Sequence, residues 1–385
     1  MTKPFPPRID VACYYRAPLK AALLRDAVLP AVRRLDERGV TAHVERHWLH
    51  GPHVRVRITG PARDPDRSDR DLDQEAGDVA AQLRAYLAEH PSYEQADEAQ
   101  LLARAESSGR AELVPGPYTP IHPDNTVRLE APDDGRISVL LGSELLLGHR
   151  AELLRAGLDP VRHGVEHLLR RGNTSSDRVW LALTAMAVHA AAYPPGIMEG
   201  HQSFRSHLED FLHLNDPSGA LRARFEGAWL KQADRATAHV DAACAAAAAE
   251  PAGDGTGAPD PAAAWARWVA HAWRVCAPAH RRGELPLPGE GYLRQAQAIG
   301  DRATVERWDS ERRTSYSEYH RALMKMDFLD DPGVAEYFGA YRFATNILYL
   351  VLALCDVTAI ERYLAAHLLS RAVPRLACDK EMTSA

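Results

Sequence analysis

The clearest alternation of hydrophobic and polar positions lies in the segment His53–Gly60, which reads "HVRVRITG". Three aliphatic residues alternate there with His53, Arg55 and Arg57. Successive side chains of a strand point to opposite faces, so the pattern predicts a half-buried strand with one aliphatic and one charged face. A surface strand has no need of two guanidinium groups in line. We therefore expect the charged face to hold a partner.

Four further elements are predicted around this strand. A helix that follows an apolar stripe is expected to break near Pro30 and to end at Gly39, a residue typical of helix C-caps. The order strand–helix–strand–strand–helix gives the first five elements of a split βαβ, ferredoxin-like unit. The predicted bounds are Ile9–Tyr15 and Val40–Trp48 for the other two strands, and Leu19–Arg38 and Leu72–His90 for the two helices.

The rest of the chain is expected to be mostly helical. Residues 113–130 form a proline-rich connector, and residues 133–150 are expected to add a short hairpin. Helical patterns dominate from Arg178, and the Ala/Gly/Pro-rich segment 243–264 predicts a surface loop. The sequence thus predicts an α+β protein with a sheet-bearing part at residues 1–135 and a mainly helical part at residues 136–385.

Composition narrows the class of protein. The chain has 385 residues, 46% of them hydrophobic, and a formal net charge of −6, so it lacks the basic footprint of a nucleic-acid-binding protein. The five cysteines are scattered without CxxC spacing, which predicts free thiols and a cytoplasmic location. The apolar run Ala344–Val357 is shorter than the roughly 20 residues of a membrane span. It predicts a buried helix, and neither a signal segment nor a membrane partner is expected.

One short motif resembles a metal site. The segment His163–His167 spells HxxEH, in which two histidines four residues apart can ligate zinc on a helix. Five residues are weak evidence, and Gly164 weakens the helix that the motif needs. We favour histidines on a helix surface and expect no metal. No phosphate-binding loop and no GxSxG is found, so no cofactor is expected either.

Three helical segments carry polar side chains suited to chemistry. In Gly200–Asn215, Ser203 and His207 share one face, while Ser206 and Asp210 share another. This pattern indicates either a binding face or the polar side of an ordinary amphipathic helix.

The second segment, Thr314–Phe328, offers Tyr316 and His320 as partners four residues apart, with Ser317 between them. Phenol, hydroxyl and imidazole groups can transfer protons at a carbonyl or an imine. The alternative interpretation is a helix with buried aromatic residues.

The third segment is the apolar stretch around residues 341–349, where Arg342, Asn346 and Tyr349 are polar exceptions. A buried polar side chain without a partner costs about 1–3 kcal/mol. These residues are therefore expected either to hold a ligand or to cap a neighbouring loop.

The strand "RHWLHGPHVRVRI" at residues 46–58, preceded by a strand and a helix and followed by a long helical half, resembles a known superfamily. It is similar to the elimination domains of LanB lanthipeptide dehydratases, and more closely to the small stand-alone members of thiopeptide biosynthesis. The helical segment 342–369 also lies where that family has its C-terminal helices.

The resemblance implies a role for the paired arginines. In elimination domains they face the glutamyl ester of a serine or threonine, and this chain keeps them as Arg55 and Arg57. It departs elsewhere: the connector has Asp124 or a neighbour where the family has an arginine, and Ile347, Leu348 or Tyr349 stands in place of a histidine. β-Elimination needs a base and a group that stabilises the leaving glutamate, and half of this equipment is missing.

Three functions therefore follow from the resemblance. The first is a pyridine synthase, which joins two dehydroalanines in a formal aza-[4+2] cycloaddition and expels water and the leader peptide. The second is a glutamate-eliminating lyase, and the third is a non-catalytic partner that binds the precursor peptide. The expected partners are a ribosomal precursor peptide and other maturation enzymes of the pathway. The expected catalytic residues are Tyr316, Ser317, His320 and Tyr349, and the expected substrate-binding residues are His53, Arg55, Arg57, Ser203, Arg205, His207, Arg342 and Asn346.

Overall fold

The computed structural model describes residues 7–60, 69–132, 134–249, 260–285, 290–309, 311–326 and 332–384. The chain divides into two compact units. The sheet unit comprises Met1–Leu158 and Pro288–Arg312, and the helical unit comprises Asp159–Leu287 and Arg313–Ala385. The domain boundary predicted at residue 135 stays a prediction, because spatial clustering alone does not show that either unit folds independently.

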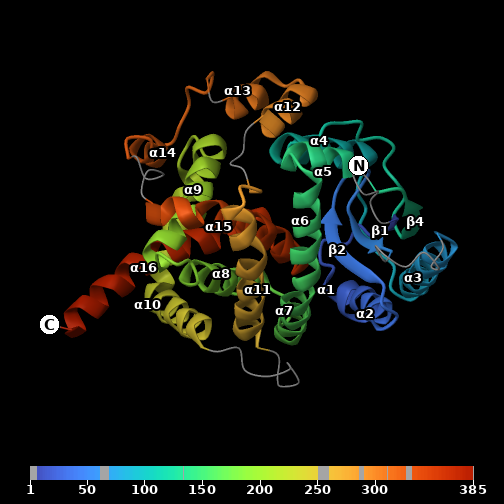
Figure 1. Cartoon of the computed structure of the whole chain (residues 1–385), viewed down its shortest axis with the longest axis horizontal. Helices are drawn as coiled ribbons and strands as arrows, with labels where there is room; N and C mark the ends of the chain where they lie inside the picture. Colours follow the sequence, from blue (N-terminus) through green and yellow to red (C-terminus); the bar gives the residue numbers. More distant parts are fainter. Residues whose placement is uncertain are drawn as a thin grey trace. The chain divides into compact units, whose positions relative to one another are not determined.

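The sheet unit is built on a four-stranded antiparallel sheet with the order β2-β3-β1-β4 (Figure 1). This order, with one helical segment between β1 and β2 and another after β3, confirms the ferredoxin-like prediction. The sixth element, β4, lies inside the predicted connector and is only five residues long, so no alternation revealed it. The strands are β1 (Arg8–Tyr14), β2 (Thr41–His47), β3 (His53–Thr59) and β4 (Thr126–Glu130).

The helices between the strands cover the aliphatic face of the sheet, with α3 against β1 and β4 and α2 against β2. The predicted break at Pro30 is a π-helical turn that ends just before it, and Pro30 stands in the first turn of α2, where no intrahelical N–H is required. Gly39, with φ +71°, ends the helix as predicted. The segments are α1 (Ala21–Leu23), η1 (Leu24–Val28), α2 (Leu29–Glu37) and α3 (Asp69–Glu89).

The hairpin predicted at residues 133–150 is wrong. This segment forms α5 (Asp134–Leu141) and the first half of α6 (Glu144–Ala156). Ser143 caps α6 by accepting a hydrogen bond from the Leu146 amide. The negative charge of Glu144 in the first turn interacts favourably with the positive end of the helix dipole. These capping signals outweigh the strand-like run of leucines. The unit also contains α4 (Glu98–Glu112), α12 (Glu290–Ile299) and α13 (Arg302–Trp308).

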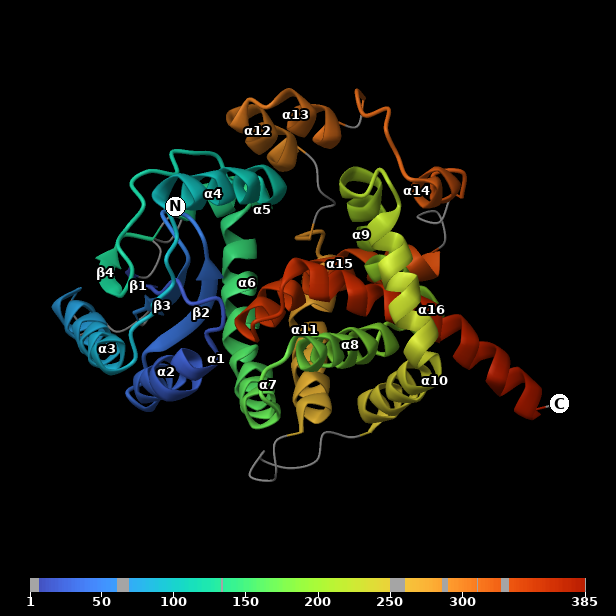
Figure 2. The same ribbon diagram turned by 180° about the vertical axis from the view of Figure 1, so that it is seen from behind.

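The helical unit is centred on α8, against which α9, α10, α11 and α16 pack (Figure 2). Gly200 permits the close approach of α9 to α8, because a Cβ there would collide with the carbonyl of Ala190. The predicted helical character of the C-terminal half is confirmed. The helices are α7 (Leu158–Arg171), α8 (Ser175–Ala191), α9 (Ile197–Asn215), α10 (Ala220–Ala248), α11 (Pro261–Arg281), α14 (Glu318–Leu323), α15 (Pro332–Leu354) and α16 (Ala359–Ser384).

The predicted surface loop at residues 243–264 is shorter than expected. Residues 243–248 end α10, and residues 261–264 begin α11 behind the N-cap Asp260. Residues 250–259, the middle of the predicted loop, lie outside the described residues.

The apolar run at residue 344 is part of α15, which packs against α11. Over Val334–Leu354 this helix is long and apolar enough to cross a membrane by length and composition, and 56% of the apolar window is buried inside the protein. It is the one such helix in the described part of the chain. The prediction of a buried helix is confirmed, since Leu348, Val351 and Leu352 are completely buried.

Candidate functional site

The charged face of the sheet carries three rows of side chains across its strands. Strand register puts one residue from each strand in every row, with Arg57, Arg55 and His53 on β3. In the order of the strands, the rows are His43, Arg57, Asp10 and Glu130; Glu45, Arg55, Ala12 and Arg128; and His47, His53, Tyr14 and Thr126.

The two arginines of this face form ion pairs with two buried carboxylates. Arg57 donates to both oxygens of Asp10, from Nε at 2.8 Å and Nη2 at 2.7 Å. Arg55 donates from Nη2 to Glu45 at 3.2 Å, and Arg150 of α6 donates to both Glu45 oxygens at 2.9 and 2.8 Å. Although burial raises the pKa of Glu45, Arg150 and Arg55 hold it well below its usual value.

The prediction of a half-buried strand is therefore wrong. Every residue of β3 except Thr59 is buried, on both faces, and Arg55 and Arg57 are 7% and 2% exposed. The alternation was read correctly, but it does not reveal that α6 packs on β2 and brings Arg150 to the charged face. The role of His53, Arg55 and Arg57 in substrate binding stays a prediction.

Histidines on this face are held in the neutral form. Burial lowers the pKa of His53 to about 3, and Arg55 adds to the effect. Burial also lowers the pKa values of His43 and His47. A histidine that is neutral in the folded state but protonated in the unfolded chain stabilises the fold above its unfolded pKa of about 6.5, and this stability is lost as the pH falls towards the folded pKa.

We therefore expect the sheet unit to lose stability on acidification from pH 6.5. Each such histidine contributes a loss of about 1.4 kcal/mol per pH unit. Amide hydrogen exchange in β3 measures this loss, and His53→Gln should reduce its pH dependence by about one proton. The same substitution at the exposed His90 is the control and should change nothing. If the stability of β3 measured by amide exchange stayed constant between pH 6.5 and 4, the assignment of neutral buried histidines would be contradicted.

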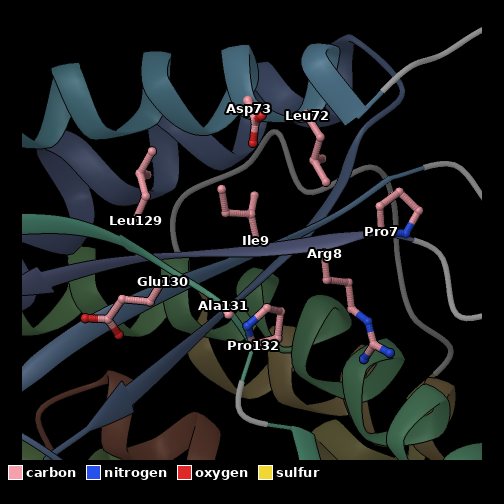
Figure 3. Close-up of a pocket in the computed structure, with 9 residues that line it drawn as sticks. All are labelled: Pro7, Arg8, Ile9, Leu72, Asp73, Leu129, Glu130, Ala131 and Pro132. Carbon is pink, nitrogen blue, oxygen red and sulfur yellow. The ribbon is translucent and has the colours of Figure 1, made fainter.

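A cavity of about 450 Å³ opens beside the edge strand β4, in the same unit. Figure 3 shows Ile9 and Leu72 on its helix side, with Arg8 and Glu130 on the other side of the strands. None of the sequence-predicted site residues lines it. Its remaining lining residues are Pro7, Asp73, Leu129, Ala131 and Pro132.

In the helical unit, His207 of α9 meets Tyr349 of α15. The phenol oxygen lies 2.8 Å from His207 Nδ1. Burial, with Arg362 and Arg342 nearby, lowers the pKa of His207 to about 4, and burial raises the pKa of the Tyr349 phenol. Both groups are therefore neutral near pH 7, and the tautomer of His207 decides which of them donates the hydrogen bond. The sequence had placed these two residues in different roles, and the structure brings them together.

His320 lies between two hydroxyl groups. Ser317 Oγ is 2.7 Å from Nδ1, and Ser206 Oγ of α9 is 2.9 Å from Nε2. Ser317 also caps α14 by accepting a hydrogen bond from the His320 amide, which fixes the position of the ring. Burial lowers the pKa of His320, so the neutral imidazole can accept a proton from one hydroxyl and donate to the other.

The predicted helical partnership of Tyr316 with His320 is wrong. Because Ser317 is the N-cap, Tyr316 precedes α14, and its ring lies under the guanidinium of Arg313 at 4.5 Å. Arg313 in turn donates to Asp210 of α9 at 2.5 Å. The segment before α14 thus contacts α9 through the Arg313–Asp210 ion pair.

The other predicted residues of this unit are on α9 and α15. Arg205 lies over the Tyr319 ring at 4.8 Å. Arg342 and Asn346 are on the same helix as Tyr349, with spacing that puts all three along one face. Within the part of the chain that the structure describes, neither Ser203 nor Asn346 makes a side-chain hydrogen bond.

The HxxEH segment lies on α7, as predicted, but His163 is not on its surface. Its side chain is buried, with Nε2 2.7 Å from Arg162 Nη2 and 3.4 Å from Asp159. Among the described residues, no group of three His, Cys, Asp or Glu side chains could hold a metal ion. The five cysteines are free thiols, and the predicted cytoplasmic location stays a prediction.

Sequence reasoning missed two residues that contact His320 and Tyr349 in the helical unit. Ser206 was noted only for sharing a face with Asp210, yet it is the hydroxyl that reaches His320. Arg362 of α16 was not noted, although its guanidinium carbon lies 4.2 Å from the centre of the Tyr349 ring. No local signal points to Arg362, because its partners are far away in the sequence.

The chain shares its fold with a solved pyridine synthase. That structure, TbtD from thiomuracin biosynthesis, is 23% identical, with a TM-score of 0.63 over 96% of this chain and 98% of that one. The structure of TsrL is 17% identical, with a TM-score of 0.60 over 96% and 95% of the two chains. The tRNA-dependent lantibiotic dehydratase MibB from Microbispora sp. 107891 is 14% identical, with a TM-score of 0.42 over 99% of this chain and 29% of that one.

The matches to TbtD and TsrL show that this chain has the same fold as these two proteins. No protein-family model and no curated protein sequence matches the chain. The similarity found by the comparisons is therefore one of fold.

Proposed function

We propose that this protein is a maturation enzyme for a ribosomal peptide and acts as a pyridine synthase of the thiopeptide type. The observation that carries the proposal is the full-length similarity of fold to the pyridine synthase TbtD. It is supported by the polar groups of the helical unit, where a phenol, two imidazoles and two serine hydroxyls form hydrogen-bonded pairs.

The proposed reaction joins two dehydroalanines of one precursor peptide. The amide that precedes the second, C-terminal dehydroalanine takes its iminol form. Two carbon–carbon bonds to the first dehydroalanine, whose nitrogen carries the leader, then close a six-membered ring that contains the iminol nitrogen. Loss of water and of the leader as its amide then removes one ring proton with each leaving group. The electrons balance without an oxidant, so the chemistry requires positioning and proton transfer.

The residues of the helical unit can supply that proton transfer. Iminol formation requires a donor for the carbonyl oxygen and an acceptor for the amide proton. The Tyr349–His207 pair has a neutral phenol and a neutral imidazole at near-neutral pH. The serine pair of His320 forms a second relay, and loss of water and of the leader amide needs such a donor and acceptor again.

The buried ion pairs argue against the lyase alternative. A glutamyl group would have to displace Asp10 or Glu45 from Arg57 or Arg55, and breaking a buried pair is strongly unfavourable. A non-catalytic peptide-binding protein has no need of hydrogen-bonded imidazoles with lowered pKa values, although it remains a distinct outcome of the test below.

We place the leader peptide at the open edge of the sheet. Within the described residues the edge strand β4 pairs only with β1, and an extended peptide can add to such an edge. The cavity beside β4, lined by both apolar and charged residues, offers space for a side chain of that peptide. Leader contacts should dominate affinity, because the modified core is small and mostly neutral. Equal calorimetric affinity for full-length and leaderless precursor would contradict this placement.

The function is tested by incubating the protein with a precursor that bears two dehydroalanines, without added cofactor. Mass spectrometry should detect a pyridine-containing macrocycle and the free leader amide in equal amounts. Binding of this precursor without any product would instead identify a peptide-binding partner. The precursor with one dehydroalanine replaced by alanine is the control, and it should remain unchanged because it lacks half of the ring.

A further inference from the structure

Among the residues that the structure describes, the guanidinium of Arg362 in the helical unit has no counter-ion. Its guanidinium carbon lies 4.2 Å from the centre of the Tyr349 ring and 5.1 Å from that of Tyr363. Its side chain makes no ion pair or hydrogen bond with the described residues, and its Nε is buried without an acceptor. By contrast, Arg178 and Arg313 of the same unit each reach a carboxylate. A half-buried arginine without a carboxylate is held by the faces of the two aromatic rings.

The contacts of Arg362 close a ring through three helices. From α16, Arg362 covers Tyr349 of α15, whose phenol meets His207 of α9. Tyr363, the next residue of α16, stacks on Phe211 of α9 at 3.9 Å and 13°. Phe211 is one helical turn beyond His207. Rotation of the Tyr349 ring would therefore break contacts with both α9 and α16.

We propose that Arg362 is a positioning residue of the ring-forming reaction, which holds the Tyr349 phenol against His207 and keeps that imidazole uncharged. This inference rests on the proposed function and extends it to a residue outside the predicted site. The guanidinium acts through the tyrosine ring, and its positive charge opposes a second positive charge on the histidine beside it.

Charged groups on four helices influence the protonation of His207. Arg362 of α16 and Arg342 of α15 disfavour protonation, as does His320 of α14, while Asp210 of α9 favours it. After burial, Arg362 is the strongest of these influences on the pKa of His207. Removing its charge should therefore let His207 protonate at a higher pH.

The test uses Arg362→Met, which keeps an unbranched apolar stem without the charge, and Arg362→Lys, which keeps the charge without the planar group. The His207 resonance, assigned by its loss in His207→Gln, is titrated by NMR in the full-length protein labelled at its histidines. Arg362→Met should raise the titration midpoint by about one pH unit, a tenfold change in proton affinity. Arg362→Lys should leave the midpoint near that of the wild type.

Turnover gives the second readout. Arg362→Met should lower kcat about tenfold with little change in KM, and should move the acidic limb of the pH profile upward. Arg371→Met is the matched control, since this arginine of α16 is exposed and pairs with Glu226. A His207 midpoint that is the same in Arg362→Met and wild type overturns the inference. Absence of product from the wild type would refute the proposed function instead, and the NMR titration would still decide the role of Arg362.

Discussion

Replacing Asp10 with alanine is expected to lower the free energy of unfolding of the sheet unit by about 3–5 kcal/mol. Asp10 is 1% exposed and accepts two hydrogen bonds from Arg57, which is itself 2% exposed. The substitution leaves a buried guanidinium with its main carboxylate removed. Denaturant unfolding, combined with hydrogen exchange in β1 and β3, measures the loss in the unit concerned.

The double variant Asp10→Leu/Arg57→Met is the matched control. Replacing both members of a buried ion pair with apolar residues is often nearly neutral, because no unpaired charge remains. The double variant should therefore be more stable than Asp10→Ala alone. A loss below about 1 kcal/mol in the single variant, the range of exposed ion pairs, would show that this face is open to water.

Replacing Tyr349 with phenylalanine is expected to lower kcat for ring formation by about 10²–10⁴-fold. The change removes the hydroxyl that lies 2.8 Å from His207 but keeps the ring beneath Arg362. Substrate binding should remain nearly intact, so KM should change little, as expected for a group that acts in the transition state. Steady-state kinetics with the bis-dehydroalanine precursor measures both constants.

Tyr363→Phe provides the same chemical change at a neighbouring tyrosine. Tyr363 also lies under Arg362, but its ring stacks on Phe211 and its hydroxyl makes no hydrogen bond with the described residues. This variant should retain kcat within about twofold, since surface substitutions away from specific contacts have small effects. Equal losses in the two variants would assign the effect to packing of the aromatic cluster.

The fold could be predicted wherever local signals agree with tertiary packing. Alternation gave β3, a C-cap glycine ended the first helix at Gly39, and an apolar run gave the buried part of α15. The prediction failed for α6, where a run of leucines resembled a strand and only the cap at Ser143 indicated a helix. It also missed β4, which is too short to show a period and is held in place by its pairing with β1.

The sequence predicted which residues belong to the candidate site better than it predicted their hydrogen-bond partners. Ser317, His320, His207 and Tyr349 were identified because hydroxyl, imidazole and phenol groups stood out on helical segments. Their partners come from distant helices: Ser206 is 114 residues from His320, and Tyr349 is 142 residues from His207.

Spacing along one helix cannot reveal such contacts. It suggested Tyr316 as a partner of His320, although the cap at Ser317 excludes that pairing. Sequence spacing also cannot predict the buried carboxylates opposite Arg55 and Arg57, because the register of the sheet joins residues from three separate strands.

We infer that the chemistry takes place in the helical unit and that the arginine strand is structural. The most direct measurement is mass spectrometry of the wild-type protein incubated in parallel with two forms of one precursor. One form carries glutamylated serines, and the other carries two dehydroalanines at the same positions. We predict that the glutamylated form keeps its mass, while the dehydroalanine form yields the pyridine macrocycle and free leader amide. Release of glutamate from the first form, with no ring from the second, would contradict the account and identify a lyase that uses Arg55 and Arg57.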